Sequence, residues 1–389
     1  MLVEERPGIA VRRSASALSC AVLSTYPPTA CGIATFSAAL CDGLVSVGID
    51  VGVVAVGHPD GPAERLVVAR LDEADPGSRA ASLAAMERAD LVIVQHEYGL
   101  YAGADGDSVA ALLEQVSTPT IVVAHTVLAR PTPHQRLVLE RVVRAADVVV
   151  VMTEVGRSRL TSGFGVDPRK VVVIPHGAAV GPSAAATARG GRPTLLTWGL
   201  LGPGKGIEWA IDALAMLDDL DPSPLYRIAG DTHPKVAATA GESYREMLEQ
   251  RASLVGVRSS VAFDAGYRGL EALGELISAA DVVVLPYDSA DQVTSGVLVD
   301  AVAAGRPVVA TAFPHAEELL ASGAGLVVPQ RDPEALAAAL RRVLTEEGLA
   351  AQMATEARRL APSLSWPAVA RRYAALAQSL SEQRAAVGA

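Results

Sequence analysis

The stretch DVVVLPYDSADQVTSGVLVDAVAAGRPVVATAFP, residues 281–314, indicates how the chain folds. Its first apolar run, residues 282–285, is too short for a core helix and is followed by a proline, which predicts a buried parallel strand. A polar loop leads to residues 296–304, whose apolar side chains recur at helical spacing, and another strand begins at Val308. Because a helix N-terminus presents unpaired amides and a positive dipole end, this unit predicts an anion site where the loop meets the helix.

Candidate ligand-binding residues lie within this loop and helix. Ser295 is placed to cap the helix N-terminus, and Gly305 is placed to end the helix. Asp300 lies about one turn into the helix, and Gln292 precedes it by eight residues, so both side chains can face the same mouth. We therefore expect one ligand site formed by Gln292, Thr294, Ser295, Gly296 and Asp300.

Length and composition favour a two-lobed α/β protein. A chain of 389 residues exceeds one ordinary domain, and half of it is hydrophobic, with a mean hydropathy of +0.30. This composition is typical of buried parallel sheets covered by alanine-rich helices, and no apolar run approaches the ~20 residues of a spanning helix. With 33 basic and 43 acidic residues, a net charge of −10 and no basic block, nucleic acid is not an expected partner.

The cysteines and the N-terminus favour a cytoplasmic protein. Cys20, Cys31 and Cys41 are odd in number and lack the spacing of metal ligands, so we expect reduced thiols. Arg12 and Arg13 precede a short apolar stretch that is too short for an export signal, and none is expected.

The first lobe is expected to span residues 18–180. A strand over residues 18–24, a Pro- and Gly-rich turn, a helix over 36–47 and a strand over 50–56 form the opening of a doubly wound lobe. Gly32 lies in the turn, either at a ligand or as a plain turn residue. Residues 59–80 carry little signal.

Histidines follow two further strands of this lobe. The strand over residues 91–94 runs into His96 and Glu97, and the strand over 120–124 ends at His125, before an irregular loop. Carboxyl ends of strands are where binding side chains lie in doubly wound sheets. A histidine hydrogen-bonded to backbone is the alternative interpretation. Other strands are expected over residues 147–152 and 171–174, with a helix over 107–115 and one from 154 to about 161.

The second lobe, residues 192–362, repeats this plan after a small, Gly-rich linker over residues 180–191. A strand over 194–198 runs into G-L-L-G-P-G-K-G, where Gly199 allows close backbone approach to a phosphate and Lys205 supplies a charge. A solvated loop lysine is the alternative. Further elements are a helix over 208–217, strands over 226–229, 260–262 and 325–328, helices over 273–279 and from Pro314 and Pro333, and a C-terminal helix over 363–383. The strand over 226–229 ends in Gly230 and Asp231, also expected at the donor site.

The sequence D-A-V-A-A-G-R-P-V, from Asp300 to Val308, resembles the donor-binding signature of retaining glycosyltransferases of family 4, glycosyl transferase group 1. Their usual form is a Glu, seven residues, a second Glu and A-M-A-x-G-x-P-V, so Gln292 and Asp300 replace the two acids. A βαβ unit of another nucleotide-binding protein is the alternative. The resemblance covers nearly the whole chain and implies the GT-B fold: two Rossmann-like lobes facing a cleft, with a C-terminal helix crossing back to the first.

The resemblance also implies roles for single residues. Lys205-Gly206 fits the family's K-G and would hold the diphosphate, although Leu200 replaces the usual Arg. Asp300 would bind the ribose, Gln292 would contact the donor sugar and His125, in a loop similar to that of a bacterial subgroup with H-T-V-L and P-x-P-H-Q, would line the sugar pocket. Gly32, of which the family has a pair, His96 and Glu97 would face the acceptor.

The implied function is transfer of a hexose-type sugar from a nucleotide diphosphate sugar to a hydroxyl of a carbohydrate or small-molecule acceptor, with retention at the anomeric carbon. No cofactor is required, and no metal-binding motif appears, with Mg²⁺ a candidate to share the phosphate charge. Gln292 and Leu200 leave two alternatives open, a GT-B-type nucleotide-sugar epimerase and a non-catalytic sugar-nucleotide-binding protein.

Overall fold

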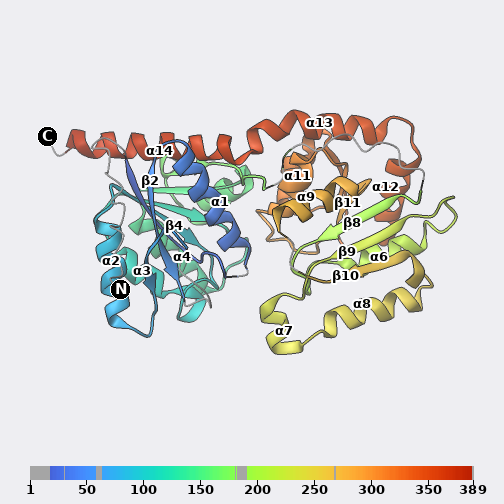
Figure 1. Cartoon of the computed structure of the whole chain (residues 1–389), viewed down its shortest axis with the longest axis horizontal. Helices are drawn as coiled ribbons and strands as arrows, with labels where there is room; N and C mark the ends of the chain where they lie inside the picture. The colour runs from blue at the N-terminus through green and yellow to red at the C-terminus, as the bar shows by residue number, and fades with distance from the viewer. Residues whose placement is uncertain are drawn as a thin grey trace, which may run out of the picture.

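The computed structural model describes residues 18–29, 31–57, 64–179, 181, 191–266 and 269–387. Two α/β lobes lie side by side, and the last two helices run along both of them (Figure 1). The predicted fold class is confirmed, since each lobe is built on a parallel sheet with helices on both faces. Residues 1–17 and most of the expected linker lie outside the described residues.

The first lobe holds a seven-stranded parallel sheet with the strand order β3-β2-β1-β4-β5-β6-β7. Its strands are β1 (Ser19–Ser24), β2 (Asp50–Val56), β3 (Val67–Leu71), β4 (Leu91–His96), β5 (Thr120–Ala124), β6 (Val148–Val151) and β7 (Val171–Val173). Its helices are α1 (Gly32–Ser46), α2 (Pro76–Glu87), α3 (Ser108–Leu113), α4 (Pro133–Ala145) and α5 (Glu154–Ser158), with a π-helical turn, Arg159–Gly163, and 3₁₀ turns at Ala104–Gly106 and Pro168–Lys170. The order reverses between β1 and β4, the switch point at which such sheets bind ligands.

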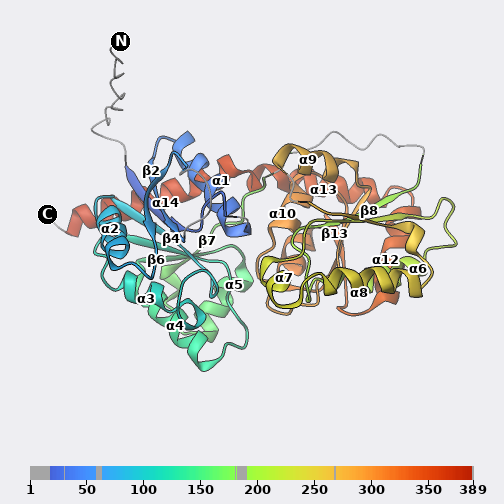
Figure 2. The same ribbon diagram turned by 60° about the horizontal axis from the view of Figure 1, so that its bottom comes forward.

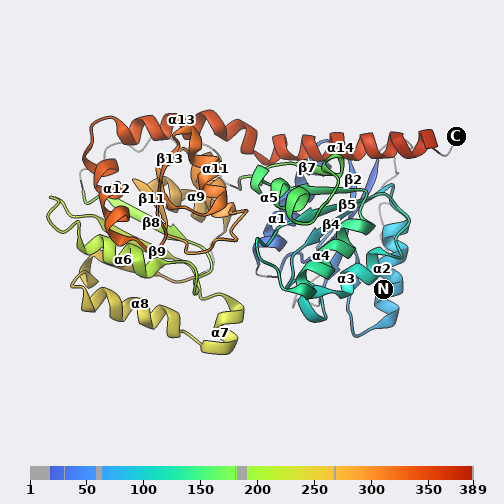
Figure 3. The same ribbon diagram turned by 180° about the vertical axis from the view of Figure 1, so that it is seen from behind.

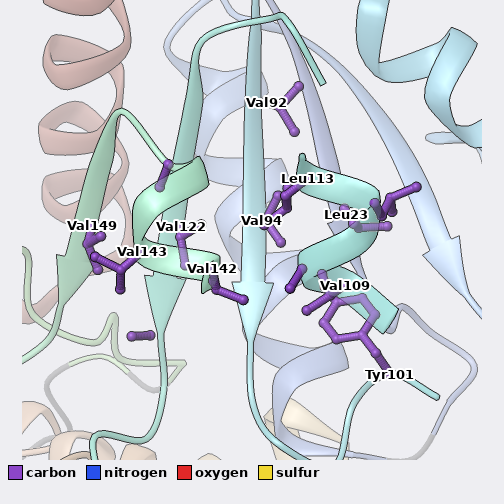
Figure 4. Packing of buried hydrophobic residues seen from close by; sticks show 14 of the residues in the cluster. Leu23, Val92, Val94, Tyr101, Val109, Leu113, Val122, Val142, Val143 and Val149 are labelled. Carbon is purple, nitrogen blue, oxygen red and sulfur yellow. The ribbon is translucent and has the colours of Figure 1, made fainter. Parts of the chain in front are cut away.

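The core of this lobe follows from the alternation of side chains along its strands. In β4, Val92 and Val94 point to the face covered by α2, α3 and α4, where Leu113 and Val142 meet them (Figure 4). Ile93 points to the opposite face, against α1. Because both faces are buried, the strands read as continuous Val and Ile runs rather than as alternating ones.

The second lobe has a six-stranded parallel sheet with the order β10-β9-β8-β11-β12-β13, the same pattern with the same switch point. Its strands are β8 (Thr194–Trp198), β9 (Leu225–Ala229), β10 (Val261–Asp264), β11 (Val282–Leu285), β12 (Val308–Thr311) and β13 (Gly325–Val328). Its helices are α6 (Ile207–Ala215), α7 (Pro234–Ala240), α8 (Ser243–Leu254), α9 (Leu270–Ala279), α10 (Gly296–Ala303), α11 (Pro314–Leu319), α12 (Pro333–Thr345) and α13 (Leu349–Leu364), with 3₁₀ turns at Arg258–Ser260 and Leu320–Ser322. Figure 2 shows α7 and α8 along one side of this lobe.

The C-terminal helix α14 (Trp366–Val387) leaves the second lobe and packs on the first, as predicted. Val369, Tyr373 and Ala377 are buried in the first-lobe core beside α1. Among the described residues, no helix is both long enough and apolar enough to cross a membrane.

Several expected elements need correction. Helix α1 begins at Gly32 and not at residue 36, because the Cys31 side chain caps it by accepting a hydrogen bond from the amide of Ala34. Gly32 therefore lies in a first helical turn and not in a glycine loop. The segment with little signal holds β3 and the start of α2, and the expected irregular loop after His125 ends at Pro133, where α4 begins.

Candidate functional site

The loop of Lys205 lies beside the first turn of α10. Gly199 has a φ of +116°, and a Cβ there would lie 3.6 Å from Cγ2 of Val297. Gly206 has a φ of +61°, and a Cβ there would meet the carbonyl oxygen of Pro286 at 1.9 Å. Both residues have a positive φ, which favours glycine, and the backbone approach at Gly206 leaves no room for a Cβ, so the β8–α6 loop packs against the segment between β11 and α10.

The ammonium of Lys205 is oriented within this loop. Its Nζ lies 4.4 Å from the centre of the Tyr287 ring, a cation–π contact. The Tyr287 ring in turn stacks on Phe313, with ring centres 5.0 Å apart. Lys205 and the N-terminus of α10 therefore lie on the same side of the second lobe, at the carboxyl ends of β8 and β11.

Gly230 and Asp231 shape the neighbouring loop. A Cβ on Gly230, whose φ is +130°, would lie 2.1 Å from the carbonyl oxygen of Gly199. Oδ1 of Asp231 accepts a hydrogen bond of 2.8 Å from the amide of Gly266. In this structure Asp231 thus holds a turn, and its contact with a donor stays a prediction.

The hydrogen-bonding groups at the start of α10 have more protein partners than the sequence predicted. Ser295 caps the helix as predicted, accepting from the amide of Leu298 at 3.3 Å. The Ser295 amide, expected to be free for an anion, donates to Nδ1 of His315 at 2.8 Å, which corrects that expectation. Burial lowers the pKa of His315 to about 3, so its ring is neutral and Nδ1 accepts.

Gly296, the first residue of α10, lies against the interlobe turn. A Cβ on Gly296 would come to 3.0 Å from both Cε1 and Nε2 of His176. Nδ1 of His176 lies 2.7 Å from the carbonyl oxygen of Gly177, which can only accept, so Nδ1 carries the proton. Burial lowers the pKa of His176 to about 4, and Nε2 is therefore an acceptor directed at the helix start.

The side chains of Gln292 and Asp300 are both hydrogen-bonded to protein groups, and they do not face one shared open site. The side-chain amide of Gln292 donates to the backbone carbonyl oxygen of Thr294, and the backbone carbonyl oxygen of Gln292 accepts from the amide of His315 at 3.3 Å. Asp300 is 9 % exposed, and its Oδ1 accepts from the amide of Ala179, after β7, at 2.7 Å. Asp300 thus ties α10 to the interlobe turn.

His125 lies in an aromatic cluster that joins the two lobes. Its Nε2 is 2.7 Å from Oε1 of Gln95, and its ring meets Phe36 edge-on at 4.9 Å. Phe36 also meets His176 and Trp366, each at 5.0 Å. Burial, aided by His176 and His96, lowers the pKa of His125 to about 3, so His125 is a neutral hydrogen-bonding group.

The expected acceptor residues differ in their placement. His96 is 1 % exposed, lies beside Tyr98 and has no hydrogen-bond partner among the described residues, and its contact with an acceptor stays a prediction. Glu97 accepts from the hydroxyl of Thr126 and from the amide of Tyr98 at 3.1 Å. Burial raises the pKa of Glu97.

Lys235, at the start of α7, was not predicted as a site residue. Its Nζ would lie 2.4 Å from a Cβ on Gly99, so an ammonium of the second lobe reaches the end of β4 in the first. Its charge opposes the rise in the pKa of Glu97 that burial causes, and burial, Lys235 and Lys205 together lower the pKa of His233. Sequence alone gave no signal for Lys235, because its role depends on how the lobes meet. Within the described ranges, no group of three or more His, Cys, Asp or Glu side chains is arranged to hold a metal ion.

Comparisons with known proteins agree with this architecture. The family described as "Glycosyltransferase Family 4" matches residues 30–180, and the one described as "Glycosyl transferases group 1" matches residues 183–360. A protein of Geodermatophilus obscurus named D-inositol 3-phosphate glycosyltransferase is 31 % identical over 69 % of this chain and 63 % of its own length. The chain thus spans less than two thirds of that relative.

Solved structures show the same fold. Sucrose-phosphate synthase of Thermosynechococcus elongatus has a TM-score of 0.76 and 21 % identity, over 93 % of this chain and 99 % of its own. HepE of Anabaena, in complex with UDP-glucose, has a TM-score of 0.72 and 18 % identity, over 93 % of this chain and 100 % of its own. With two family matches that together run from residue 30 to residue 360, the chain belongs to the group 1 glycosyltransferases of family 4 and has their two-lobed GT-B fold.

Proposed function

We propose that the protein transfers a hexose-type sugar from a nucleotide diphosphate sugar to an acceptor hydroxyl, with retention at the anomeric carbon. The observation that carries this proposal is that the loop of Lys205 packs beside the start of α10, with Gly199 next to Val297 and the Lys205 ammonium over the Tyr287 ring. A diphosphate between them would meet an ammonium and the positive end of a helix dipole, both of which stabilise a departing anion. Asp300 binds the ribose and Gln292 contacts the donor sugar in this proposal. The loops of the proposed donor site contain Gly199, Gly230 and Asp231.

In this proposal the leaving diphosphate also acts as the base for the acceptor hydroxyl. The bond between the anomeric carbon and the phosphate oxygen breaks, the acceptor oxygen bonds to the same face of that carbon, and the acceptor proton passes to the phosphate. Because Gln292 and the buried His125 are uncharged, they position the sugar by hydrogen bonds and do not stabilise positive charge. Stabilisation therefore falls to the phosphate side, where Mg²⁺ stays a candidate to share the charge.

The acceptor enters from the first lobe, at Gly32 and Glu97. The relative named D-inositol 3-phosphate glycosyltransferase makes a phosphorylated polyol the first acceptor to test. Lys235, which reaches from the second lobe to the end of β4, would attract such an anion. The thiols of Cys20, Cys31 and Cys41, all without disulfides, favour a cytoplasmic location.

Turnover measurements test the proposal. UDP-, GDP- and ADP-sugars are incubated with inositol 3-phosphate and with other polyols, nucleoside diphosphate release is measured, and the anomeric configuration of the product is read by NMR. We expect acceptor-dependent release and a retained configuration, and Lys205→Ala should lower kcat/KM on the order of 100-fold. Lys170→Ala, which changes a first-lobe lysine bonded to the carbonyl of Arg144, is the matched control. Donor conversion without acceptor would point to an epimerase, and binding without turnover to a sensor.

A further inference from the structure

The loop that carries Gln292 is held by the first lobe as well as by its own. Oδ1 of Asp291, the residue before Gln292, accepts from the amide of Ala129 at 2.8 Å and from Nη1 of Arg159 at 3.2 Å. Nη2 of Arg159 donates to the carbonyl oxygen of Ala290 at 2.9 Å. Two consecutive loop residues are therefore fixed by groups more than a hundred positions earlier in the chain.

Arg159 is held in place for this contact. Its Nη1 also donates to the carbonyl oxygen of Val127, in its own lobe, at 2.8 Å, and only 17 % of its side chain is exposed. It is the first residue of the π-helical turn that continues α5, an irregularity that often marks functional positions. Because the guanidinium is bonded on its own side, it is in position before the second lobe meets it.

Two more contacts across the boundary flank this one. The hydroxyl of Thr153 donates to the carbonyl oxygen of Val293 at 3.1 Å. The carboxylate of Glu318, in α11, accepts from the amides of Glu154 and Val155, at 2.9 and 3.1 Å, and so caps α5 from the other lobe. Figure 3 shows α5 and α11 next to each other at the boundary of the lobes.

Gln292 itself bonds to groups of the second lobe, through the amide of His315 and the carbonyl of Thr294. Its neighbours on both sides, Asp291 and Val293, bond to the first lobe. The side chain proposed to contact the donor sugar thus takes its position from both lobes at once.

We propose that Arg159 is a positioning residue: it fixes Ala290 and Asp291 across the lobe boundary and so places Gln292 against the donor sugar when the lobes are together. This inference rests on the proposed function for the role of Gln292, but the tethering of the loop is a property of the protein alone. Each of these bonds involves a charged group, and the Arg159–Asp291 bond is partly buried, so together they hold the loop more firmly than a single exposed ion pair would.

Hydrogen exchange of the unliganded full chain tests the tether without any substrate. In Arg159→Met, amides of residues 287–295 should exchange on the order of tenfold faster, since charged hydrogen bonds contribute that much or more to an opening equilibrium. Arg141→Met is the matched control, because Arg141 forms two bonds with Glu114 within the first lobe and away from the boundary. Asp291→Asn, a milder change, should give a smaller increase. Exchange of this segment at the wild-type rate in both Arg159→Met and Asp291→Asn would overturn the proposal.

Kinetics with UDP-glucose as the probe donor test the connection to Gln292. We expect Arg159→Met to lower kcat on the order of 10- to 100-fold with little change in KM, because it disturbs placement more than binding. In a Gln292→Ala background the same substitution should cause no further loss, and Arg159→Lys should restore part of the activity. Losses that multiply in the double variant would show that Arg159 does not act through Gln292. If wild-type protein turns over no nucleotide sugar, the proposed function fails, and the exchange measurement still decides whether Arg159 tethers the loop.

Discussion

The imidazole of His176 lies on Gly296, so that a Cβ at Gly296 would come within 3.0 Å of both Cε1 and Nε2 of the ring. This contact joins the interlobe turn to the start of α10. A histidine and a glycine 120 positions apart in the chain thus set how closely the lobes approach each other at the proposed donor site.

Gly296→Ala should disturb this contact. Because the added methyl group requires the His176 ring to move by a few tenths of an ångström, we expect kcat/KM to fall about tenfold and stability to fall by about 1–3 kcal/mol. Steady-state kinetics and thermal unfolding measure the two effects. His176→Ala in the same chain should relieve the stability loss, while Gly269→Ala, at a position with no atom within 4 Å of the new Cβ, should change little. Wild-type activity in Gly296→Ala would show that the contact does not matter.

The buried histidines should make the protein sensitive to acid. Desolvation lowers the pKa of His96 and His176 to about 4 and of His125 and His315 to about 3, from 6.5. Below pH 6.5 the unfolded chain binds protons that the folded chain does not, so stability is complete above that pH and falls as the pH drops towards 4. Urea unfolding at pH 7, 6 and 5 should show this loss.

One substitution measures the contribution of a single histidine, His315, to this loss of stability at low pH. In His315→Asn, a side-chain oxygen can still accept from the Ser295 amide, but the group no longer titrates. Between pH 6 and 5, the free energy of unfolding should therefore fall by about 1 kcal/mol less than in wild type. An unchanged pH dependence would mean that His315 is protonated equally in the folded and unfolded chain.

Tyr373 on α14 offers a test of packing between the C-terminal helix and the first lobe. Its ring is fully buried and its hydroxyl has no hydrogen-bond partner among the described residues. Tyr373→Phe should therefore leave the free energy of unfolding unchanged or raise it by about 1 kcal/mol, whereas Tyr373→Ala should lower it by about 3–5 kcal/mol. Tyr226→Phe is the control, since the Tyr226 hydroxyl bonds Thr197 Oγ1 at 2.8 Å and its loss should destabilise. Equal losses in the two Phe variants would indicate a partner for the Tyr373 hydroxyl.

Much of the fold could be predicted because buried parallel strands are recognisable in the sequence as short runs of Val and Ile. The strands over residues 282–285 and 325–328 have the predicted bounds, Ser295 caps its helix as expected, and a helix begins at Pro333 as expected. β3 was missed because it is an edge strand that is only partly buried, so its pattern is weak. α4 was missed although Thr132 and Gln135 form a capping box with Pro133 at the first turn, a signal present in the sequence.

Only those parts of the candidate site that lie within a single loop could be predicted from the sequence. The loop of Lys205 and the start of α10 were each expected from a strand followed by a helix, and both lie at the carboxyl ends of neighbouring strands, β8 and β11. The contacts of Arg159 with Asp291 and of Lys235 with Gly99 depend on how two separate lobes meet, which no local pattern encodes. The Ser295 amide was expected to be free because His315, its partner, comes from the next helix.

The most direct test of the central claim, that Lys205 and the start of α10 hold a diphosphate, compares nucleotides that differ by one phosphate. The tightest binder among UDP, GDP and ADP is titrated calorimetrically, with its monophosphate, into wild type, Lys205→Ala and Lys170→Ala. We expect the diphosphate to bind wild type and Lys170→Ala about 10- to 100-fold more tightly than the monophosphate, and Lys205→Ala to lose most of that difference. A Lys205→Ala variant that keeps the full preference for the diphosphate would contradict the account.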